Sequence, residues 1–386
     1  MEVAIIGAGA AGCFCAIELK RLRPDARVTI YEAGPKPLAK VAITGGGRCN
    51  LTNTFENISS LEEAYPRGHR LMRRVFSIFS PEDCRAWFEN EGVRLVAQDD
   101  GCIFPKSQDA MEIVSTLLRL CNELGVRIRT GARITDLRSL DADVKIVTTG
   151  GSPKRAGLSF LDGYGLEIVP PVPSLFTFEI ADAGLRSLSG TVVRDVEVRL
   201  SGTSFKASGP LLITDWGVSG PAILKLSSYA ARYLADNQYK ADLSINWGCS
   251  FTPPGGNKLV STAHPSALTS RLWSHLVSRS GLRPDIRCAE LGAKGLNKLA
   301  ETLKNDVYHI TGKGRFKEEF VTCGGVALSN ISLTTLEARN APGLYFAGEV
   351  LDVDAITGGF NLQAAWSMAF AVARSLARAL ARSAAA

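Results

Sequence analysis

The chain has 386 residues, which is more than one hydrophobic core usually covers, so two or three domains are expected. Hydrophobic residues make up 46% and charged residues 21%, as in soluble globular proteins, which excludes a fibrous or disordered class. The net charge of +6 is mild, and the basic residues are spread out beside acidic ones without a long run of Lys and Arg, so an ordinary solvated surface is favoured over a nucleic-acid-binding face.

A β-α-β unit is predicted at the N-terminus. An apolar strand from Glu2 to Ile6 precedes a helix from Ala10 to Leu22, and a second strand runs from Arg27 to Tyr31. Further along, Ser80 is a favourable N-cap for a helix that begins at Pro81. The other elements expected before residue 150 are a helix ending at 91, a helix at 110–124, and strand segments at 126–129, 133–137 and 144–148.

Prolines 170, 171 and 173 mark a domain boundary, after which the predicted secondary structure changes. Short alternating strands follow and predict a β-rich insert, with helices after it. The predicted strands are 174–180, 191–200, 211–214 and 240–247, the helices are 266–278 and 289–303, and strands at 316–321 and 343–347 precede a last helix at 361–382. The expected domains are 1–172 with 316–386, a β-rich insert at 173–250, and a helical or mixed insert at 251–315.

The cysteines indicate a reducing compartment. There are nine, irregularly spaced and without paired C-x-x-C motifs, so no metal site is expected. Several lie in apolar runs, which favours free thiols and a cytoplasmic location. No signal peptide is expected, because Glu2 stands where a basic residue should be. Arg374, Arg378 and Arg382 interrupt the C-terminal apolar stretch, so no membrane span is expected.

A phosphate-binding turn is predicted between the first strand and the first helix. Its G-x-G-x-x-G pattern gives a tight turn, a close approach of a pyrophosphate to the backbone, and close packing of helix on strand. The helix N-terminus adds unpaired N–H groups and a partial positive charge. The candidate residues are Gly7, Gly9, Ala10, Ala11 and Gly12.

Glu32 ends the second strand, twenty residues after Gly12. A carboxylate at this place accepts hydrogen bonds from both hydroxyls of an adenosine ribose and repels a 2′-phosphate. The nucleotide is therefore expected to be FAD or NAD and not NADP.

A second glycine cluster follows as a loop able to press its backbone against a flat or anionic group. Its arginine can pair with a phosphate, its asparagine can donate and accept, and an upstream lysine adds positive charge. The candidate residues are Lys40, Thr44, Gly45, Gly46, Arg48, Cys49 and Asn50.

Glycine turns recur near the other end of the chain. One opens the last helix, and such a helix end favours the negative charge that develops at the pyrimidine carbonyl of a reduced flavin. The candidate residues are Gly348, Glu349, Asp352, Gly358, Gly359, Phe360, Asn361 and Leu362, with Thr149 and Gly150 as a further contact after the strand at 144–148.

Taken together, these motifs resemble the BaiN-like NAD(P)/FAD-dependent oxidoreductases. The resemblance spans almost the whole chain and is most specific in the runs TGGGRCNLTN (44–53) and GLYFAGEVLDVDAITGGFNLQ (343–363). It also includes VSGP (218–221) and VTCGGV (321–326). The sequence departs from the usual family pattern at Cys102, Thr148 and Phe360, where Arg, Ala and Tyr are usual.

The resemblance implies an α/β fold: a Rossmann-like, glutathione-reductase-like FAD-binding domain built from both chain ends, with an inserted β-barrel-like segment and a small helical segment. It implies that Gly7–Gly12 hold the pyrophosphate, that Gly45–Asn50 line the flavin, and that Gly359–Leu362 cap its pyrimidine edge. Gly348, Glu349 and Asp352 would follow the ribityl chain, and Arg133 would contact the adenine side. The connections at 138–143 and 157–170 are short for such a fold.

The implied reaction is hydride transfer through flavin N5 from NAD(P)H to a conjugated, enone-like small molecule, of a steroid-like or bile-acid-like kind. Because no second G-x-G-x-x-G precedes an acidic residue, NAD(P)H is expected as a transient co-substrate. The catalytic residue stays unknown: the four histidines, Tyr164 and Tyr345 have no distinguishing context, and Cys49 is a redox-thiol candidate without a C-x-x-C partner. Two alternatives are an RNA-modifying flavoprotein and a non-enzymatic flavin carrier or redox partner. The sequence leaves the oligomeric state open.

Overall fold

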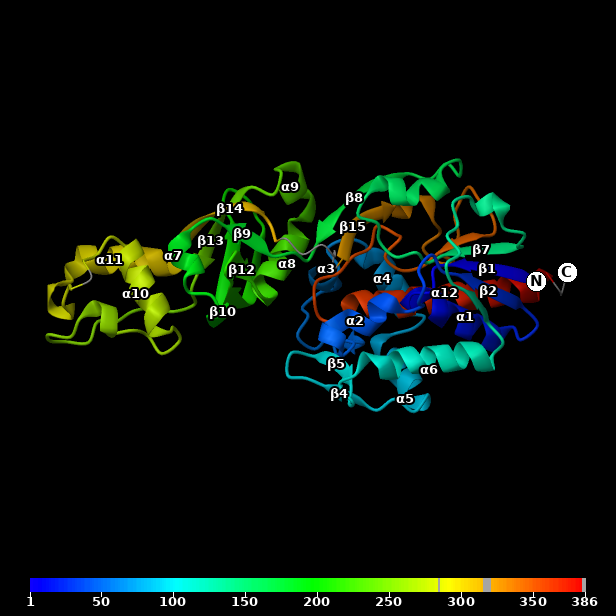
Figure 1. The fold of residues 1–386 in the computed structure, drawn as a ribbon, viewed down its shortest axis with the longest axis horizontal. Coiled ribbons are helices and arrows are strands. Elements are labelled where there is room, and N and C mark those ends of the chain that lie inside the picture. Colours follow the sequence, from blue (N-terminus) through cyan, green and yellow to red (C-terminus); the bar gives the residue numbers. More distant parts are fainter. Residues whose placement is uncertain (284, 315–320, 384–386) are drawn as a thin grey trace. The chain divides into compact units, whose positions relative to one another are not determined.

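The computed structural model describes residues 1–283, 285–314 and 321–383. The chain divides into two compact units, Met1–Val172 with Val321–Ala386, called here the split unit, and Pro173–Phe320, called the insert unit. Figure 1 shows the elements of both units, coloured along the sequence.

The split unit contains a five-stranded parallel sheet of order β16-β7-β1-β2-β6. Its central strand is buried and apolar, and Ile5 pairs with Ile30 on one side and Ile146 on the other. Strand β16 comes from the C-terminal part of the chain and extends the sheet by pairing Tyr345 with Ile146. The strands are β1 (Glu2–Ile6), β2 (Arg27–Tyr31), β6 (Arg127–Arg129), β7 (Val144–Val147) and β16 (Leu344–Phe346).

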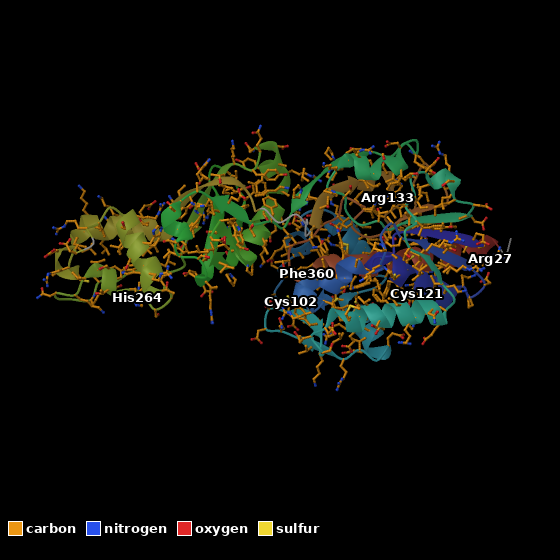
Figure 2. All side chains as sticks on the ribbon, in the orientation of Figure 1. Arg27, Cys102, Cys121, Arg133, His264 and Phe360 are labelled. Atoms are coloured by element: carbon orange, nitrogen blue, oxygen red, sulfur yellow. The ribbon has the colours of Figure 1, made fainter. Side chains whose placement is uncertain are left out.

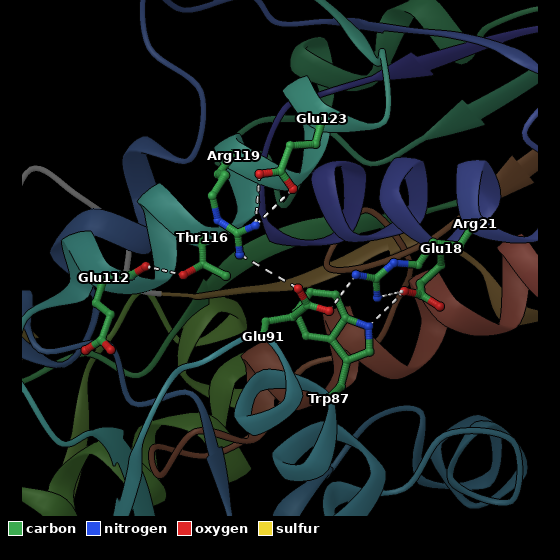
Figure 3. Close-up of polar contacts among 8 residues, drawn as sticks. All are labelled: Glu18, Arg21, Trp87, Glu91, Glu112, Thr116, Arg119 and Glu123. Carbon is green, nitrogen blue, oxygen red and sulfur yellow. Dashed lines mark hydrogen bonds and ion pairs between the residues drawn. The ribbon is translucent and has the colours of Figure 1, made fainter.

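Helices from the two chain ends pack together in the split unit: α1 (Ala10–Leu22) against α12 (Phe360–Ser383). The ring of Phe14 lies 5.4 Å from that of Trp366 and 4.6 Å from that of Trp87, so aromatic packing joins both helices to α5 (Pro81–Asn90). The buried Glu18 carboxylate accepts a 2.8 Å hydrogen bond from Trp87 Nε1 and pairs with Arg21, as Figure 3 shows. This carboxylate is therefore a structural group.

The remaining elements of the split unit surround this sheet and helix pair. Ser80 and Asp83 form a reciprocal capping box at the start of α5, so the predicted N-cap is present. The helices are α2 (Ala39–Gly47), α3 (Leu61–Ala64), α4 (His69–Phe76) and α6 (Ala110–Glu123). Strands β3 (Thr52–Asn53), β5 (Cys102–Pro105) and β4 (Leu95–Ala97) form an antiparallel sheet, and β8 (Ile168–Ser174) pairs with β15 (Val321–Val326).

The insert unit is built on a closed barrel of order β10-β11-β12-β9-β14-β13. Its apolar core includes the fully buried Trp247 and Trp273. The strands are β9 (Phe178–Ile180), β10 (Val192–Leu200), β11 (Lys206–Ile213), β12 (Gly217–Ser219), β13 (Ala241–Asn246) and β14 (Asp306–Lys313). The helices are α7 (Ala183–Arg186), α8 (Pro221–Tyr229), α9 (Ala231–Asp236), α10 (Ser270–Arg279) and α11 (Gly292–Lys304).

The predicted fold class is confirmed, since a Rossmann-type α/β sheet and a six-stranded barrel are both present. The predicted strand at 133–137 is wrong: β6 ends at Arg129, the chain turns at Gly131 with φ of +65°, and Leu137–Ser139 is a 3-10 turn. Helix α10 starts at Ser270, later than the predicted 266, because the Thr269 side chain caps it by accepting from Leu272 N. The predicted strand at 316–321 lies outside the described residues except for Val321, where β15 begins.

The three-part domain division stays a prediction. Within the described residues, no helix is long and apolar enough to cross a membrane.

Candidate functional site

The turn between β1 and α1 has the geometry that its glycines require. Gly7 has a φ of +109°, and a Cβ there would lie 2.5 Å from the Thr148 carbonyl oxygen. A Cβ on Gly12 would lie 2.0 Å from the Gly7 carbonyl oxygen. Because both contacts are far shorter than van der Waals distance, helix and turn approach this closely only with glycine at these positions.

The N-terminus of α1 offers its amides without a side chain in the way. Gly9 is the N-cap, no side chain caps the helix, and the first turn has no acidic residue. A Cβ built on Gly9 meets no described atom within 4 Å. The partial positive charge of this helix end is therefore placed to hold an anion such as a pyrophosphate.

Glu32 is fixed beside the same turn. Its carboxylate accepts hydrogen bonds from the Ala8 amide at 2.8 Å and from the Gly34 amide at 2.7 Å. These two bonds set the orientation of the carboxylate next to the predicted pyrophosphate position. The charge that the sequence predicts for ribose recognition is thus held rigidly by the backbone.

A cavity of about 450 Å³ lies next to Glu32. Its wall includes Ile6, Gly7 and Tyr31 at the carboxyl ends of β1 and β2, and Thr149 and Gly150 after β7. The structure also places Arg133 in this wall, and Figure 2 labels Arg133 in the split unit. The carboxyl ends of parallel strands are where nucleotides bind in such sheets, so this cavity suits an adenosine.

The second glycine cluster interrupts α2. Thr44, Gly45 and Gly46 have non-helical backbone angles inside the helix, and the chain stays left-handed at Gly47. Arg48 donates from Nε to the Gly45 carbonyl at 3.1 Å, and its guanidinium lies 4.5 Å from the centre of the Phe104 ring. The predicted loop is present, and Arg48 holds its shape from within.

The second glycine cluster meets the C-terminal one. With the Asn50 amide oriented to satisfy its neighbours, its oxygen accepts from Gly359 N at 3.2 Å and its nitrogen donates to Thr52 O at 3.0 Å. Asn53 Nδ2 donates to Gly358 O at 2.9 Å. A Cβ on Gly359 would lie 2.4 Å from Thr52 O, so this close approach also needs glycine.

The start of α12 is fixed by side chains on both sides. Asn361 closes the preceding loop, accepting from Ala355 N and donating to Ala355 O, each at 3.0 Å. Phe360 is 2% exposed, its ring packs against Phe55, and its carbonyl accepts from Tyr65 Oη at 2.8 Å. A helix end held in this way can present its amides to a ligand without reorganisation.

Residues 64–68 contact the loop that precedes α12 at several further points. Ala64 O accepts from Ile356 N at 2.9 Å. Arg67 pairs with the carboxylate of Asp354, whose side chain has no exposed surface. Gly68 has a φ of +83°, and a Cβ there would strike Val353 at 2.6 Å. No local sequence pattern marks Tyr65, Arg67 or Asp354 as residues of this site.

Glu349, in the glycine turn after β16, lies close to residues of α2 and β15. Its Oε1 accepts from Thr322 N at 2.7 Å, and its Oε2 lies 3.8 Å from Lys40 Nζ. A Cβ on Gly151 would lie 2.7 Å from Glu349 Oε1, and one on Gly348 would lie 3.2 Å from Ala11 Cβ. All three predicted glycine clusters therefore lie around the start of α1 or the start of α12. The amide of Asp352 donates to Val326 O at 2.9 Å.

The thiol of Cys49 does not have the properties of a redox-active group. Its side chain has no exposed surface, and burial raises the pKa of its thiol to about 12. Because the thiolate is the reactive form, burial argues against the redox-thiol interpretation. Of the four histidines, His69 lies in α4 of the split unit, 3.2 Å from Glu62 Oε1, and the other three lie in the insert unit.

A family model for the HI0933-like protein Rossmann domain matches residues 1–375. A ribosomal RNA dihydrouridine synthase of Escherichia coli (strain K12) is 29% identical over 401 residues, which covers 97% of each chain. A 3-dehydro-bile acid delta(4,6)-reductase of Clostridium scindens is 28% identical over 405 residues, covering 97% of this chain and 98% of that protein.

Solved structures show the same fold at low identity. The 3-ketosteroid delta1-dehydrogenase from Sterolibacterium denitrificans superposes with a TM-score of 0.50 at 13% identity, covering 98% of this chain and 99% of that one. A mutant of the E. coli quinol fumarate reductase also has a TM-score of 0.50 at 13% identity, covering 99% of this chain and 71% of that one.

Proposed function

Because the chain belongs to the HI0933-like Rossmann family, we propose that it is an FAD-dependent oxidoreductase. The observation that carries the proposal is the convergence of three glycine clusters from distant parts of the chain. The clusters lie around two helix N-termini, those of α1 and α12. They are Gly7–Gly12, Gly45–Asn50 and Gly358–Leu362. Such paired helix ends suit a ligand with an anionic centre and a second, electron-accepting end.

The residues present fit FAD. The open approach above Gly9 leaves room for a pyrophosphate against the α1 amides. The fixed Glu32 carboxylate would accept from the ribose hydroxyls, and the cavity beside it would take the adenine, with Arg133 in its wall. The start of α12, held by Asn361 and Tyr65, would orient the flavin ring.

The cofactor supplies hydride chemistry when it is bound. The α12 amides would stabilise the negative charge that the pyrimidine edge gains on reduction. The packed aromatic side chains of Phe55, Tyr65 and Phe360 would exclude water from that edge. No described side chain stands out as the proton donor.

We propose that the reaction is reduction of a carbon–carbon double bond conjugated to a carbonyl, in a small molecule of steroid-like or bile-acid-like shape. The bile-acid delta(4,6)-reductase among the relatives supports this class. Hydride addition to the far carbon of such a system puts charge on the carbonyl oxygen, and protonation completes the reduction. NAD(P)H is the proposed hydride donor, as a transient co-substrate.

A second candidate substrate is uridine in RNA, favoured by the relatives that are ribosomal RNA dihydrouridine synthases. The C5=C6 bond of uracil is itself conjugated to a carbonyl, so the chemistry of the two candidates is the same. They differ in the size and charge of what must be bound, and this difference can be tested.

The test begins with the visible spectrum of the purified protein, followed by anaerobic addition of NADH or NADPH. We expect a bound flavin that one of the nicotinamides bleaches. A panel of unsaturated ketones, including a steroid 4,6-dien-3-one, and a uridine-containing RNA then compete to reoxidise it under anaerobic conditions. Faster reoxidation by a ketone supports the first substrate, and dihydrouridine in the RNA supports the second.

Two results would contradict the proposal. A colourless protein that does not take up added FAD would rule out FAD as the cofactor. A yellow protein that neither nicotinamide bleaches, with or without an acceptor, would favour a flavin carrier over an enzyme.

A further inference from the structure

Positive charge is concentrated in the insert unit. Residues 173–320 hold 18 of the 44 Lys and Arg residues but only 13 of the 38 Asp and Glu residues. The rest of the chain is therefore close to neutral, and nearly all of the net charge of +6 belongs to the insert. A domain with this excess attracts an anionic partner more strongly than the chain average indicates.

Three lysines of the insert lie at one end of its barrel. Lys206 opens β11, Lys240 directly precedes β13, and Lys313 closes β14. The strand register brings these positions to the same end. Lys206 pairs with Arg199 near the end of β10, and the neighbouring Leu200 pairs with Leu243 near the start of β13. Ala241, at the start of β13, pairs with Ile310 near the end of β14. All three lysines are exposed.

Aromatic rings lie among these lysines. The rings of Phe205 and Tyr233 are 5.8 Å apart, and Lys313 Nζ lies 5.2 Å from the centre of the Tyr239 ring. Phe205, Tyr233 and Tyr239 are partly buried residues that pack against the barrel core, so the core holds them in place while they remain partly exposed. We call Phe205, Lys206, Tyr233, Tyr239, Lys240 and Lys313 the α9 end, since Tyr233 belongs to α9.

At the opposite end of the barrel, an arginine is paired within the unit. There Arg279 of α10 pairs with Asp306 at 2.7 Å and with Asp182 at 3.2 Å. Trp247 Nε1 donates to Asp306 at 3.1 Å, and Figure 1 shows α10 and α9 at opposite ends of the barrel. The Arg279 charge is thus matched by two carboxylates within the unit, while the three lysines of the α9 end are exposed.

We propose that the α9 end binds single-stranded RNA. Bases stack on Phe205 and Tyr233, and the lysines contact consecutive phosphates, which is how single strands are held without sequence readout. Three lysines at one end of the barrel match a chain of repeated charges better than the single carboxylate of a bile-acid-like molecule. The inference rests on the second candidate substrate and names the surface that would recognise it.

The test uses the full chain with its flavin and a fluorescently labelled, uridine-rich RNA of about 12 nucleotides, a length within the 4–16 nucleotides that single-strand-binding folds cover. Fluorescence anisotropy gives the Kd at several salt concentrations. We expect binding that weakens with salt and that a duplex of the same sequence does not reproduce. Absence of salt-dependent RNA binding, or equal affinity for the duplex, would overturn the proposal.

Charge variants locate the surface. Each phosphate contact to a single strand contributes about 0.7 to the slope of log K against log salt, so Lys206→Gln/Lys313→Gln should lower that slope by about 1.4. Lys294→Gln/Lys298→Gln removes the same charge from exposed positions of α11 and should leave the slope unchanged. Equal effects of the two double variants would indicate only the general charge of the unit and would overturn the assignment.

A stacking variant adds an independent readout. Tyr233→Ala should weaken RNA binding by about 5- to 150-fold and leave the salt slope unchanged, because stacking carries no charge. Because Tyr233 also packs on the core, circular dichroism must show a folded insert before the loss is counted.

If a steroid carboxylate, and not RNA, loses affinity in the lysine variant, the surface belongs to the small-molecule substrate. Flavin content and its bleaching by NAD(P)H are read separately, so failure here leaves the flavoenzyme proposal standing.

Discussion

Arg67 and Asp354 form a buried ion pair between positions 287 residues apart in the chain. Arg67 Nε lies 2.6 Å from Asp354 Oδ1, and the second guanidinium nitrogen contacts Oδ2. The two side chains are 11% and 0% exposed. This pair ties the segment after α3 to the loop that leads into α12, so it positions the helix end proposed to face the flavin.

Replacing Asp354 by Asn should destabilise the protein strongly. The substitution keeps the shape of the side chain but leaves the Arg67 guanidinium buried without its counter-charge, which costs about 3–5 kcal/mol of unfolding free energy. Urea denaturation measures the loss. Arg27→Gln is the matched control, because its pair with Glu2 is exposed and contributes about 0–1 kcal/mol. Equal losses in the two variants would contradict the structural role of the buried pair.

Substitution by alanine should affect different properties at Gly9 and at Gly12: FAD binding at the first and stability at the second. A methyl group on Gly9 meets no described atom, so Gly9→Ala should fold with nearly unchanged stability but weaken FAD binding by occupying the pyrophosphate approach. Gly12→Ala should lower stability itself, since its Cβ would lie 2.0 Å from the Gly7 carbonyl. Thermal unfolding of the flavin-free proteins and flavin titration separate the two effects. Gly9→Ala with normal FAD affinity would argue against the proposed pyrophosphate position.

Glu32→Gln should weaken FAD binding by about 10- to 150-fold. Hydrogen bonds to a charged group contribute about 1.5–3 kcal/mol, and each 1.4 kcal/mol is a factor of ten in Kd. The amide group also turns a donor toward one of the backbone N–H groups that the carboxylate now accepts from. Flavin fluorescence quenching gives the Kd, with Glu62→Gln as an exposed control. An unchanged Kd would place the ribose elsewhere.

Cysteine alkylation should occur first at Cys249. Eight of the nine cysteines are buried, and Cys249 is the half-buried exception. Burial raises the pKa of Cys49 to about 12, so its thiol stays protonated and unreactive at pH 8. Iodoacetamide labelling of the folded protein followed by mass spectrometry measures the order. Early labelling of Cys49, with loss of flavin bleaching, would restore it as a redox thiol.

The stability of the insert unit should fall as the pH drops below about 6.5. Burial lowers the pKa of His275 below its ordinary value, although Asp182 opposes the shift. The unfolded chain therefore takes up this proton first, so the stability is complete above the unfolded pKa and is lost as the pH falls through the folded pKa. The urea concentration at the unfolding midpoint, measured between pH 5 and 7.5, should depend less steeply on pH in His275→Gln than in the native protein. A pH dependence that is the same in His275→Gln and in the native protein would contradict the assignment to His275.

The sequence was sufficient for those parts of the fold that short-range patterns encode. The first strand, the glycine turn and the first helix follow from apolar runs and glycine spacing, and Ser80 with Pro81 marked the start of α5 correctly. The strand predicted at 133–137 failed because Ile134 and Leu137 are apolar but follow the left-handed turn at Gly131. A local pattern does not reveal that the sheet has already ended.

The candidate site was predicted in its glycines but not in what holds them. Gly359 is recognisable in the sequence, whereas its contacts with Asn50 and Thr52 depend on bringing positions about 310 residues apart together. Tyr65, Arg67 and Asp354 have no special spacing, and their role becomes visible only in three dimensions. The alignment of these groups is a tertiary property that residue patterns do not carry.

The split unit has a consequence for the order of biosynthesis. Its edge strand β16 begins about 170 residues after Val172 and its helix α12 about 190 residues after it, because the whole insert is translated in between. At 5–20 residues per second, the N-terminal half waits roughly 10–35 s with the face of α1 that packs on α12 uncovered. During that time the nascent chain presents Phe14 and its apolar neighbours to chaperones and to other chains. Truncation after the insert should therefore give an insoluble product.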